Sequence, residues 1–193
     1  MNKLTAADLW KLEDYARERP AFRTRVLAHK QARTIHLGAH LTLVFEDRIT
    51  VQYQVQEMLR IERIFEAAGI VDELAAYNPL IPDGSNLKAT LLIEYDDIDV
   101  RRRELERLRG IEHDIRLVVD GHPPIVAIAD EDLERSNESK TSAVHFLRFE
   151  LDQGTVSAFR AGAQVHLAIA HPHYHATSEL DGAQRSALLA DLA

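Results

Sequence analysis

Two histidines lie on apolar faces of predicted strands, where an imidazole can serve as a metal ligand, a general base or a buried hydrogen-bonding group. In the predicted strand 141–151 side chains alternate between two faces, and His145 shares its face with Leu147. His171 follows the predicted strand 165–170 on that strand's apolar face. Strand ends that lead into loops often carry functional residues. A lone imidazole on an apolar face is more often a core histidine than a ligand, and both interpretations stay open.

Two glutamates of a predicted long helix, residues 48–68, supply carboxylates that could also serve as metal ligands or as acid–base groups. On a helical wheel Glu62 falls in the middle of the main apolar face. An ionised carboxylate there is costly unless it is paired or bound to metal, so Glu62 is predicted to be a buried acid, base or ligand, or half of a structural salt bridge. Glu57 lies on a weaker apolar strip about 140° away, so the two carboxylates do not act on one atom. The main apolar face carries Val51, Val55, Met58 and Phe65.

Together, His145, His171, Glu62 and Glu57 are the candidate ligands of a zinc or iron site. Neutral imidazoles and carboxylates bind either metal, and an open coordination position would activate water or oxygen. The histidine-rich run 171–175 is an incomplete ligand pattern. The sequence contains no Glu-x-x-His pair, no His-Glu-x-x-His motif, no phosphate loop, no dinucleotide glycine fingerprint and no nucleophile elbow. No catalytic residue is therefore assigned.

The remaining face of the helix 48–68 is polar, and it is either solvated or turned toward a partner protein. It carries Gln52, Gln56, Arg60 and Arg63. A polar helix face opposite an apolar one is the usual pattern of a helix at the surface of a protein. Gln56, Arg60 and Arg63 are therefore the candidate partner-binding residues.

Hydrophobic periodicity predicts one α+β domain over residues 1–193. A helix-rich part, 1–82, precedes a β-rich part, 86–193. The helix 48–68, closed by Gly69, is expected to pack on a mainly antiparallel sheet from the second part. Strands are predicted at 34–37, 41–45, 87–95, 115–119, 125–129, 141–151 and 165–170. Further helices are predicted at 71–76, 99–108, 156–161 and 182–192, together with one helix before Pro20 and one after it.

Composition narrows the classes of function. The 193 residues are 46% hydrophobic and 28% charged, with a formal net charge of -8. This acidic balance argues against sequence-independent nucleic-acid binding and against attachment to anionic membranes. There is no cysteine, which excludes disulfides, thiolate metal sites and iron–sulfur ligation by this chain. No apolar signal core follows Met1 and no run is long enough to span a bilayer, so we expect a cytoplasmic protein.

Five segments of the chain are distinctive in combination. They are Phe45–Arg48, Val55–Ile64, Tyr77–Pro82, Ser142–Phe149, and His171–Pro172 with Tyr174. Over essentially its whole length the chain resembles a family of bacterial proteins known as domain of unknown function three-five-zero-one. The resemblance brings no established catalytic or binding residue. Members of that family tend to be encoded beside rubrerythrin-like and iron–sulfur-binding proteins, which implies a part in peroxide defence, and so in oxidative stress, or in electron transfer.

Two hypotheses of function remain at this point. The first is a non-catalytic accessory protein that docks on a redox partner of rubrerythrin-like or iron–sulfur type, through Gln56, Arg60 and Arg63 or through the prolines near Asn78. The second is a metal-dependent enzyme or metal carrier that holds zinc or iron through the four candidate ligands. The first is preferred because no ligand spacing is diagnostic. The sequence leaves the oligomeric state open, a homo-oligomer included.

Overall fold

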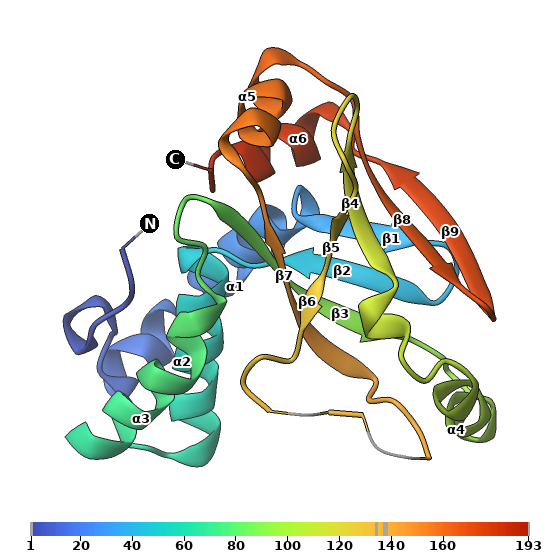
Figure 1. Ribbon diagram of the computed structural model, residues 1–193. Coiled ribbons are helices and arrows are strands. Elements are labelled where there is room, and N and C mark those ends of the chain that lie inside the picture. The colour runs from blue at the N-terminus through green and yellow to red at the C-terminus, as the bar shows by residue number, and fades with distance from the viewer. Residues whose placement is uncertain (1, 134, 137–138, 193) are drawn as a thin grey trace.

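Strands with alternating apolar residues build two antiparallel sheets whose inward faces meet in one core (Figure 1). The structure is a computed structural model that describes residues 2–133, 135–136 and 139–192. The first sheet has the strand order β1 (Thr34–Leu37), β2 (Leu41–Phe45), β3 (Asn86–Ile93), β7 (Val144–Glu150) and β6 (Ile128–Ala129). The second has the order β5 (Ile125–Val126), β4 (Ile115–Val119), β8 (Val165–His171) and β9 (Tyr174–Glu179).

The core lies between these two sheets, and period-two burial decides which side chains enter it. In β7 the side chains of His145, Leu147 and Phe149 are buried, whereas those of Phe146 and Arg148 on the opposite face are only partly covered. The inward residues of β1, β2, β3, β4, β7 and β8 belong to a single hydrophobic cluster. The two sheets therefore share one interior, and the outer face of the first sheet is left for the helices.

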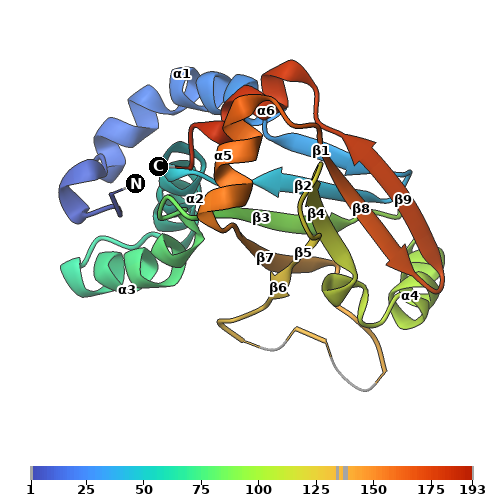
Figure 2. The same ribbon diagram turned by 45° about the horizontal axis from the view of Figure 1, so that its top comes forward.

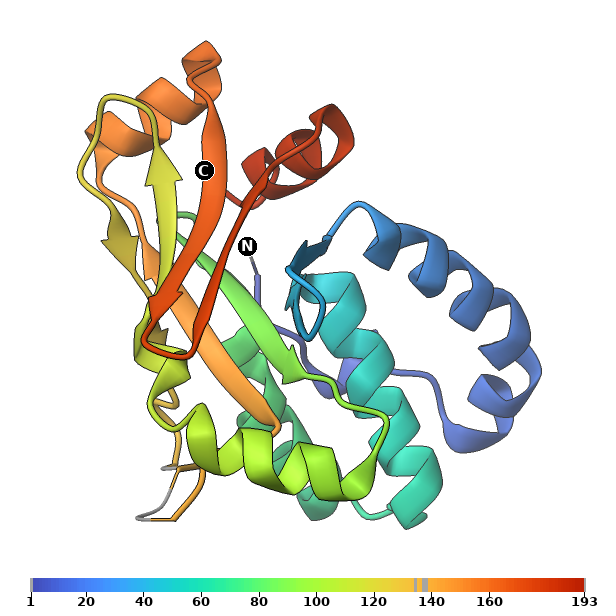
Figure 3. The same cartoon turned by 90° about the vertical axis from the view of Figure 1, so that its right-hand side faces the viewer.

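Helices cover the outer face of the first sheet and both ends of the sheet pair. Three of them, α1 (Leu12–Gln31), α2 (Arg48–Glu62) and α3 (Ala67–Tyr77), form a layer beside the first sheet (Figure 1). At one end of the sheets lie α5 (Gln153–Ala161) and α6 (Gly182–Leu189), and at the other end lies α4 (Ile98–Arg107) (Figure 3). Three short 3-10 helices are η1 (Ala6–Asp8), η2 (Asn78–Leu80) and η3 (Ile111–His113).

The predicted α+β class with mainly antiparallel sheets is confirmed, but the sheets are assembled differently from the prediction. Two strands, β1 and β2, come from the helix-rich first part of the chain, and β2 pairs with β3 across the division at residues 82–86. The predicted strand 125–129 is divided, because β5 pairs with β4 and β6 pairs with β7. β9 was not predicted, because most of its residues are small or polar and its inward side chains, among them Tyr174 and Ala176, are only partly buried against the core.

The predicted helix 48–68 is wrong beyond Glu62. Arg63 has the left-handed φ of 55°, and the backbone N–H of Ile64 donates to the carbonyl of Leu59, which closes α2. Gly69, predicted to end the helix, lies inside α3 instead. A Cβ at position 69 would lie 2.7 Å from Cγ2 of Ile64. The glycine is therefore needed for the turn to fold back on α3, and helical periodicity does not report this requirement.

Pro20 was expected to separate two helices, and this is also wrong. α1 runs through Pro20 without interruption, although its ribbon is curved (Figure 2). Proline removes one helical N–H and crowds the preceding turn, which bends a helix whose ends are held by other contacts. The ends of α1 are held here, since Tyr15, Phe22 and Val26 are buried against neighbouring aromatic and aliphatic side chains. In the described part of the chain, no helix combines the length and the apolar character needed to cross a membrane.

A buried ion network ties the last residues of the chain to the junction of α1 and α2. Arg33 is 3% exposed, and its guanidinium donates to both carboxylate oxygens of Asp191, at 2.7 and 2.9 Å. Its Nε lies 3.1 Å from Oδ2 of Asp47, the same oxygen that lies 2.6 Å from Nε2 of His29. Asp47 also caps α2, because its Oδ1 accepts the backbone N–H of Thr50. Buried charges are stable only when they are paired, so these contacts fix three segments together.

We expect Asp191→Ala to lower the free energy of unfolding by about 3 kcal/mol or more, because it leaves the buried guanidinium of Arg33 without its two-oxygen partner. Urea denaturation followed by circular dichroism measures the loss. The double variant Arg33→Met, Asp191→Leu should lose much less, since both charges are removed together. An Asp191→Ala variant as stable as the parent would contradict the importance of this pair.

Candidate functional site

His145 is the centre of a buried polar network. Its position in β7 is opposite Leu91 of β3, on the inward face of the first sheet, and its side chain is completely buried. Nδ1 lies 2.6 Å from Oδ2 of Asp130, and Nε2 lies 2.8 Å from Oγ1 of Thr141 and 3.1 Å from the carbonyl oxygen of Ser142. Both ring nitrogens therefore already have partners within the protein.

A second carboxylate closes the network on the far side of Thr141. Oε2 of Glu112 accepts a hydrogen bond from Oγ1 of Thr141 at 3.0 Å and lies 3.9 Å from Nε2 of His145. Burial by itself would raise the pKa of Glu112, but hydrogen bonds from Ser136, the backbone and Thr141, together with the charge of His145, outweigh burial and lower the pKa. Glu112 is therefore held as a carboxylate, and the network joins η3, the start of β7 and the segment after β6.

Asp130 is held in a strained conformation by the same network. Its φ of 52° lies in the left-handed region, which few residues other than glycine adopt. Its Oδ1 accepts the backbone N–H of Phe146 at 3.0 Å, and the guanidinium of Arg135 lies 3.3 Å from the same oxygen. These contacts, with the bond to His145, stabilise a backbone conformation that costs about 1–3 kcal/mol elsewhere.

The order carboxylate, imidazole, hydroxyl is the order found in catalytic triads. In this protein, however, Thr141 is 1% exposed and His145 is fully buried, so no substrate reaches either the hydroxyl or the imidazole. The arrangement satisfies buried polar groups and fixes the segment that joins β6 to β7. It supports the core-histidine interpretation of His145.

His171 is also engaged by the backbone. It is 5% exposed at the end of β8, where its Nδ1 accepts the N–H of His173 and its Nε2 lies 3.2 Å from the carbonyl oxygen of Arg109. The first bond leaves the proton on Nε2, which can then donate to the carbonyl. His171 therefore caps the β8–β9 hairpin and links it to the segment after α4. His173 and His175 are exposed.

The two glutamates differ from each other in burial. The prediction that Glu62 is buried is wrong: Glu62 is exposed at the last residue of α2, because the helix ends there and its apolar face does not continue. Glu57 is largely covered and accepts hydrogen bonds from Arg19, at 2.7 and 2.9 Å, and from Tyr15, at 2.7 Å. Glu57 thus forms a structural ion pair between α1 and α2.

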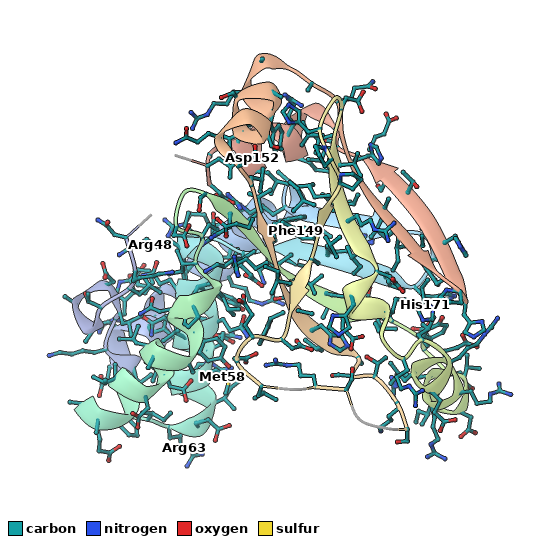
Figure 4. All side chains as sticks on the ribbon, viewed as in Figure 1. Arg48, Met58, Arg63, Phe149, Asp152 and His171 are labelled. Carbon is teal, nitrogen blue, oxygen red and sulfur yellow. The ribbon has the colours of Figure 1, made fainter. Side chains whose placement is uncertain are left out.

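The structure does not bring the four candidate ligands together. Met58, the neighbour of Glu57, lies on the opposite side of the molecule from His171 (Figure 4). Within residues 2–133, 135–136 and 139–192, no group of three or more histidine, aspartate or glutamate side chains has a geometry that could hold a metal ion. The four residues serve separate hydrogen-bonded or solvated positions.

The candidate partner-binding residues also separate. Gln56 is completely buried, and its side-chain amide contacts the backbone N–H and carbonyl of Trp10. It is not available to a partner, so this prediction is wrong. Arg60 is partly exposed and lies 3.3 Å from Glu57, and Arg63 is exposed at the end of α2 (Figure 4). Of the three candidate partner-binding residues, the two that are exposed lie at the end of α2.

A surface cavity of about 360 Å³ lies between η2 and the outer face of the first sheet. Its lining includes Pro79 and Leu80 of η2, Lys88 of β3, and Phe146 and Arg148 of β7. Sequence analysis did not single out Lys88 or Arg148. In the sequence, each of them is only a polar residue at an outward position of a predicted strand. Many exposed strands have such residues, so this pattern does not indicate a site.

The model of the family described as "Protein of unknown function (DUF3501)" matches residues 3–192. The chain belongs to the DUF3501 family. The resemblance inferred from the five sequence segments is thus confirmed. A crystal structure of a protein of unknown function from Burkholderia pseudomallei K96243 is similar to this DUF3501 chain, with 50% sequence identity, 100% of both chains covered and a TM-score of 0.95. No curated protein matches the chain. Family and fold are established by these comparisons.

We expect His145→Leu to lower the free energy of unfolding of this DUF3501 protein by about 2–4 kcal/mol, because Asp130 and Thr141 lose a buried hydrogen-bond partner. Equilibrium urea denaturation is the measurement. The matched control is His173→Leu at an exposed position, which should change stability by less than about 0.5 kcal/mol. Equal stability of the two variants would contradict a structural role for His145.

Glu57 should make the stability of the protein depend on acid pH. The hydrogen bond from Arg19, opposed by burial and helped by Tyr15 and Arg60, lowers the pKa of Glu57 from 4.5 to about 2. Since the pKa is lower in the folded state, the stabilisation is fully present above pH 4.5 and is lost as the pH falls toward 2.

Glu57→Gln should therefore flatten the fall in unfolding free energy between pH 4.5 and pH 2, as measured by urea denaturation at stepped pH. Glu62→Gln, at an exposed position of the same helix, serves as the control and should leave the slope of the parent. If Glu57→Gln had the same slope as the parent over that range, the folded-state pKa would not be lowered.

Proposed function

We propose that this DUF3501 protein is a cytoplasmic, non-catalytic accessory protein that acts by binding another protein, and that the turn between α2 and α3 is its docking surface. The observation that carries the proposal is exposed apolar surface. Ile61, Phe65 and Val71 are 57%, 63% and 58% exposed, and all three lie within one short stretch of the chain around this turn. Large apolar side chains gathered at the surface of a soluble protein are typical of interaction sites.

Charged residues of both signs accompany these apolar side chains. Arg60 and Arg63 supply positive charge, and Glu62 and Glu66 supply negative charge, around the end of α2. Arg63 occupies a left-handed position for which glycine is the usual residue. An arginine costs more there than a glycine does. An apolar centre with charged surroundings suits a protein partner rather than a membrane.

The partner that we propose is a rubrerythrin-like or iron–sulfur redox protein, the class that the family resemblance implies. The chain has no cysteine with which to hold a cluster of its own. The ring nitrogens of its two candidate histidines are engaged by internal partners. Both facts support a role in positioning or regulating a redox protein rather than in carrying electrons.

The test is a direct binding measurement between the purified chain and a rubrerythrin-like protein from the same organism, by isothermal titration calorimetry. We expect Phe65→Ser combined with Ile61→Ser to weaken binding about tenfold or more, because central apolar contacts contribute most of the affinity. The matched control is Ile98→Ser on α4, since Ile98 is equally exposed at 65% but lies away from the α2–α3 turn. The control should bind like the parent.

Three outcomes would overturn the proposal. Absence of binding by the parent chain would show that the rubrerythrin-like protein is not its partner. An equal loss in Ile98→Ser would place the contact elsewhere. Self-association of the parent that is abolished by Phe65→Ser, without binding to the redox protein, would make a second copy of the chain the occupant of this surface.

A further inference from the structure

The cavity beneath η2 combines apolar residues with charged residues of both signs. Pro79 and Leu80 form part of the wall, and Phe146 extends the apolar lining on the outer face of β7. Lys88 and Arg148 lie on the same sheet face and are both lining residues of the cavity. Small-molecule sites in proteins usually combine apolar walls with polar groups that fix the orientation of the ligand, and this cavity offers both.

The two cations are forced together by the strand register. Lys88 of β3 is paired directly with Arg148 of β7 across the antiparallel ladder. Like charges at directly opposed positions destabilise a sheet. A third cation is close, because the ammonium groups of Lys3 and Lys88 both donate to the carbonyl oxygen of Ile81, at 2.7 and 3.2 Å. Lys88 and Arg148 therefore lie side by side on the outer face of the sheet, and the ammonium of Lys3 lies next to that of Lys88.

The ammonium group of Lys88 has one hydrogen-bond donor that is not used by the protein contacts described next. Its ammonium donates to the carbonyl oxygens of Pro79, at 2.6 Å, and Ile81, at 3.2 Å, and among the described residues no carboxylate forms an ion pair with it. An ammonium has three donors, so one remains. Burial lowers the pKa of Lys88, and the charge of Lys3 lowers it further. The carboxylates of Asp83 and Glu131 act on this ammonium without forming an ion pair with it, and a bound anion could accept its remaining donor directly.

Arg148 already shows which anion fits. Nε and Nη2 of Arg148 each lie 2.8 Å from a different carboxylate oxygen of Glu131, which is the two-bond geometry preferred between guanidinium and carboxylate. The Glu131 side chain is 52% exposed, so it can turn into water without breaking a buried contact. Arg148 keeps Glu150 as a second partner when Glu131 leaves.

We propose that this cavity binds a small organic monocarboxylate with an apolar tail. The carboxylate takes the place of Glu131 on Arg148 and accepts the free donor of Lys88, and the tail lies on Leu80 and Phe146. Glu131 thus occupies the site as an internal stand-in for the ligand. The proposal concerns a second site and does not depend on the docking surface at the α2–α3 turn.

The charges around the cavity favour a single carboxylate over a phosphate. The lining contains two cations and four carboxylates, Asp83, Glu131, Asp132 and Glu150. A dianion would be repelled by the carboxylates that remain after Glu131 turns away, whereas a monoanion only replaces the charge that Glu131 removes. Inorganic phosphate has no apolar group to contact the apolar wall, whereas an alkyl or aryl tail can pack against it.

The test is isothermal titration calorimetry of the full chain with sodium hexanoate. We expect the parent to bind hexanoate and Glu131→Gln to bind it roughly tenfold more tightly, because the competing carboxylate is gone. Lys88→Met should weaken binding about tenfold or more, and its fold is checked by circular dichroism. Glu179→Gln, at an exposed position of β9, is the matched control and should bind like the parent.

Hexanol and inorganic phosphate separate the sources of affinity. If hexanol binds as tightly as hexanoate, the cavity recognises only the tail and the proposal fails. If phosphate binds more tightly than hexanoate, the site is a phosphate site and the proposal fails. Absence of hexanoate binding in both the parent and Glu131→Gln also overturns it, since Glu131→Gln alters only an exposed side chain.

Discussion

The register between β3 and β7 is the constraint on which the rest of the structure depends. Side chains alternate across a sheet, so one choice of register decides both of its faces. In this register Leu91 lies opposite His145 on the inward face, and Lys88 lies opposite Arg148 on the outward face. A slip of β7 by one residue would move the imidazole of His145 out of the core and the guanidinium of Arg148 into it. The buried network and the cationic cavity are therefore two sides of the same ladder.

Charged side chains in the interior of the protein join distant segments, and each is held by ion pairs or hydrogen bonds. Arg33 and Asp191 connect the end of α1 with the last residues described, and His145 with Asp130 connects β7 with the segment after β6. No buried side-chain nitrogen or oxygen in the described part of the chain lacks a hydrogen-bond partner. Such complete satisfaction is what a structural polar network requires, because a single unpaired group would cost about 1–3 kcal/mol. Because these buried groups are engaged by internal partners, binding at the surface depends on other residues.

Those other residues lie around α3. Its N-terminal end follows the turn that exposes Phe65, and its C-terminal end contributes Ala76 to the cavity wall. The same short helix therefore borders the proposed docking surface and the proposed ligand site. Apolar contacts hold α3 to α2, with Leu74 buried against residues that include Leu59.

The amino-acid sequence was enough to predict the class of fold, the family and the strands with clear alternation: the predicted ranges 41–45 and 115–119 agree with β2 and β4. It also determined that His145 lies on an apolar face. The strands and the apolar face of His145 follow from local periodicity, which reports which side of an element is apolar, whereas the family follows from the resemblance of five segments. The end of α2 at Glu62 appears only in the folded protein, where Arg63 takes the left-handed conformation. The tertiary structure alone decided that His145 meets Asp130 and that Lys88 faces Arg148. Such pairings join residues far apart in the chain, and a pattern along one segment holds no information about the partner that another segment supplies.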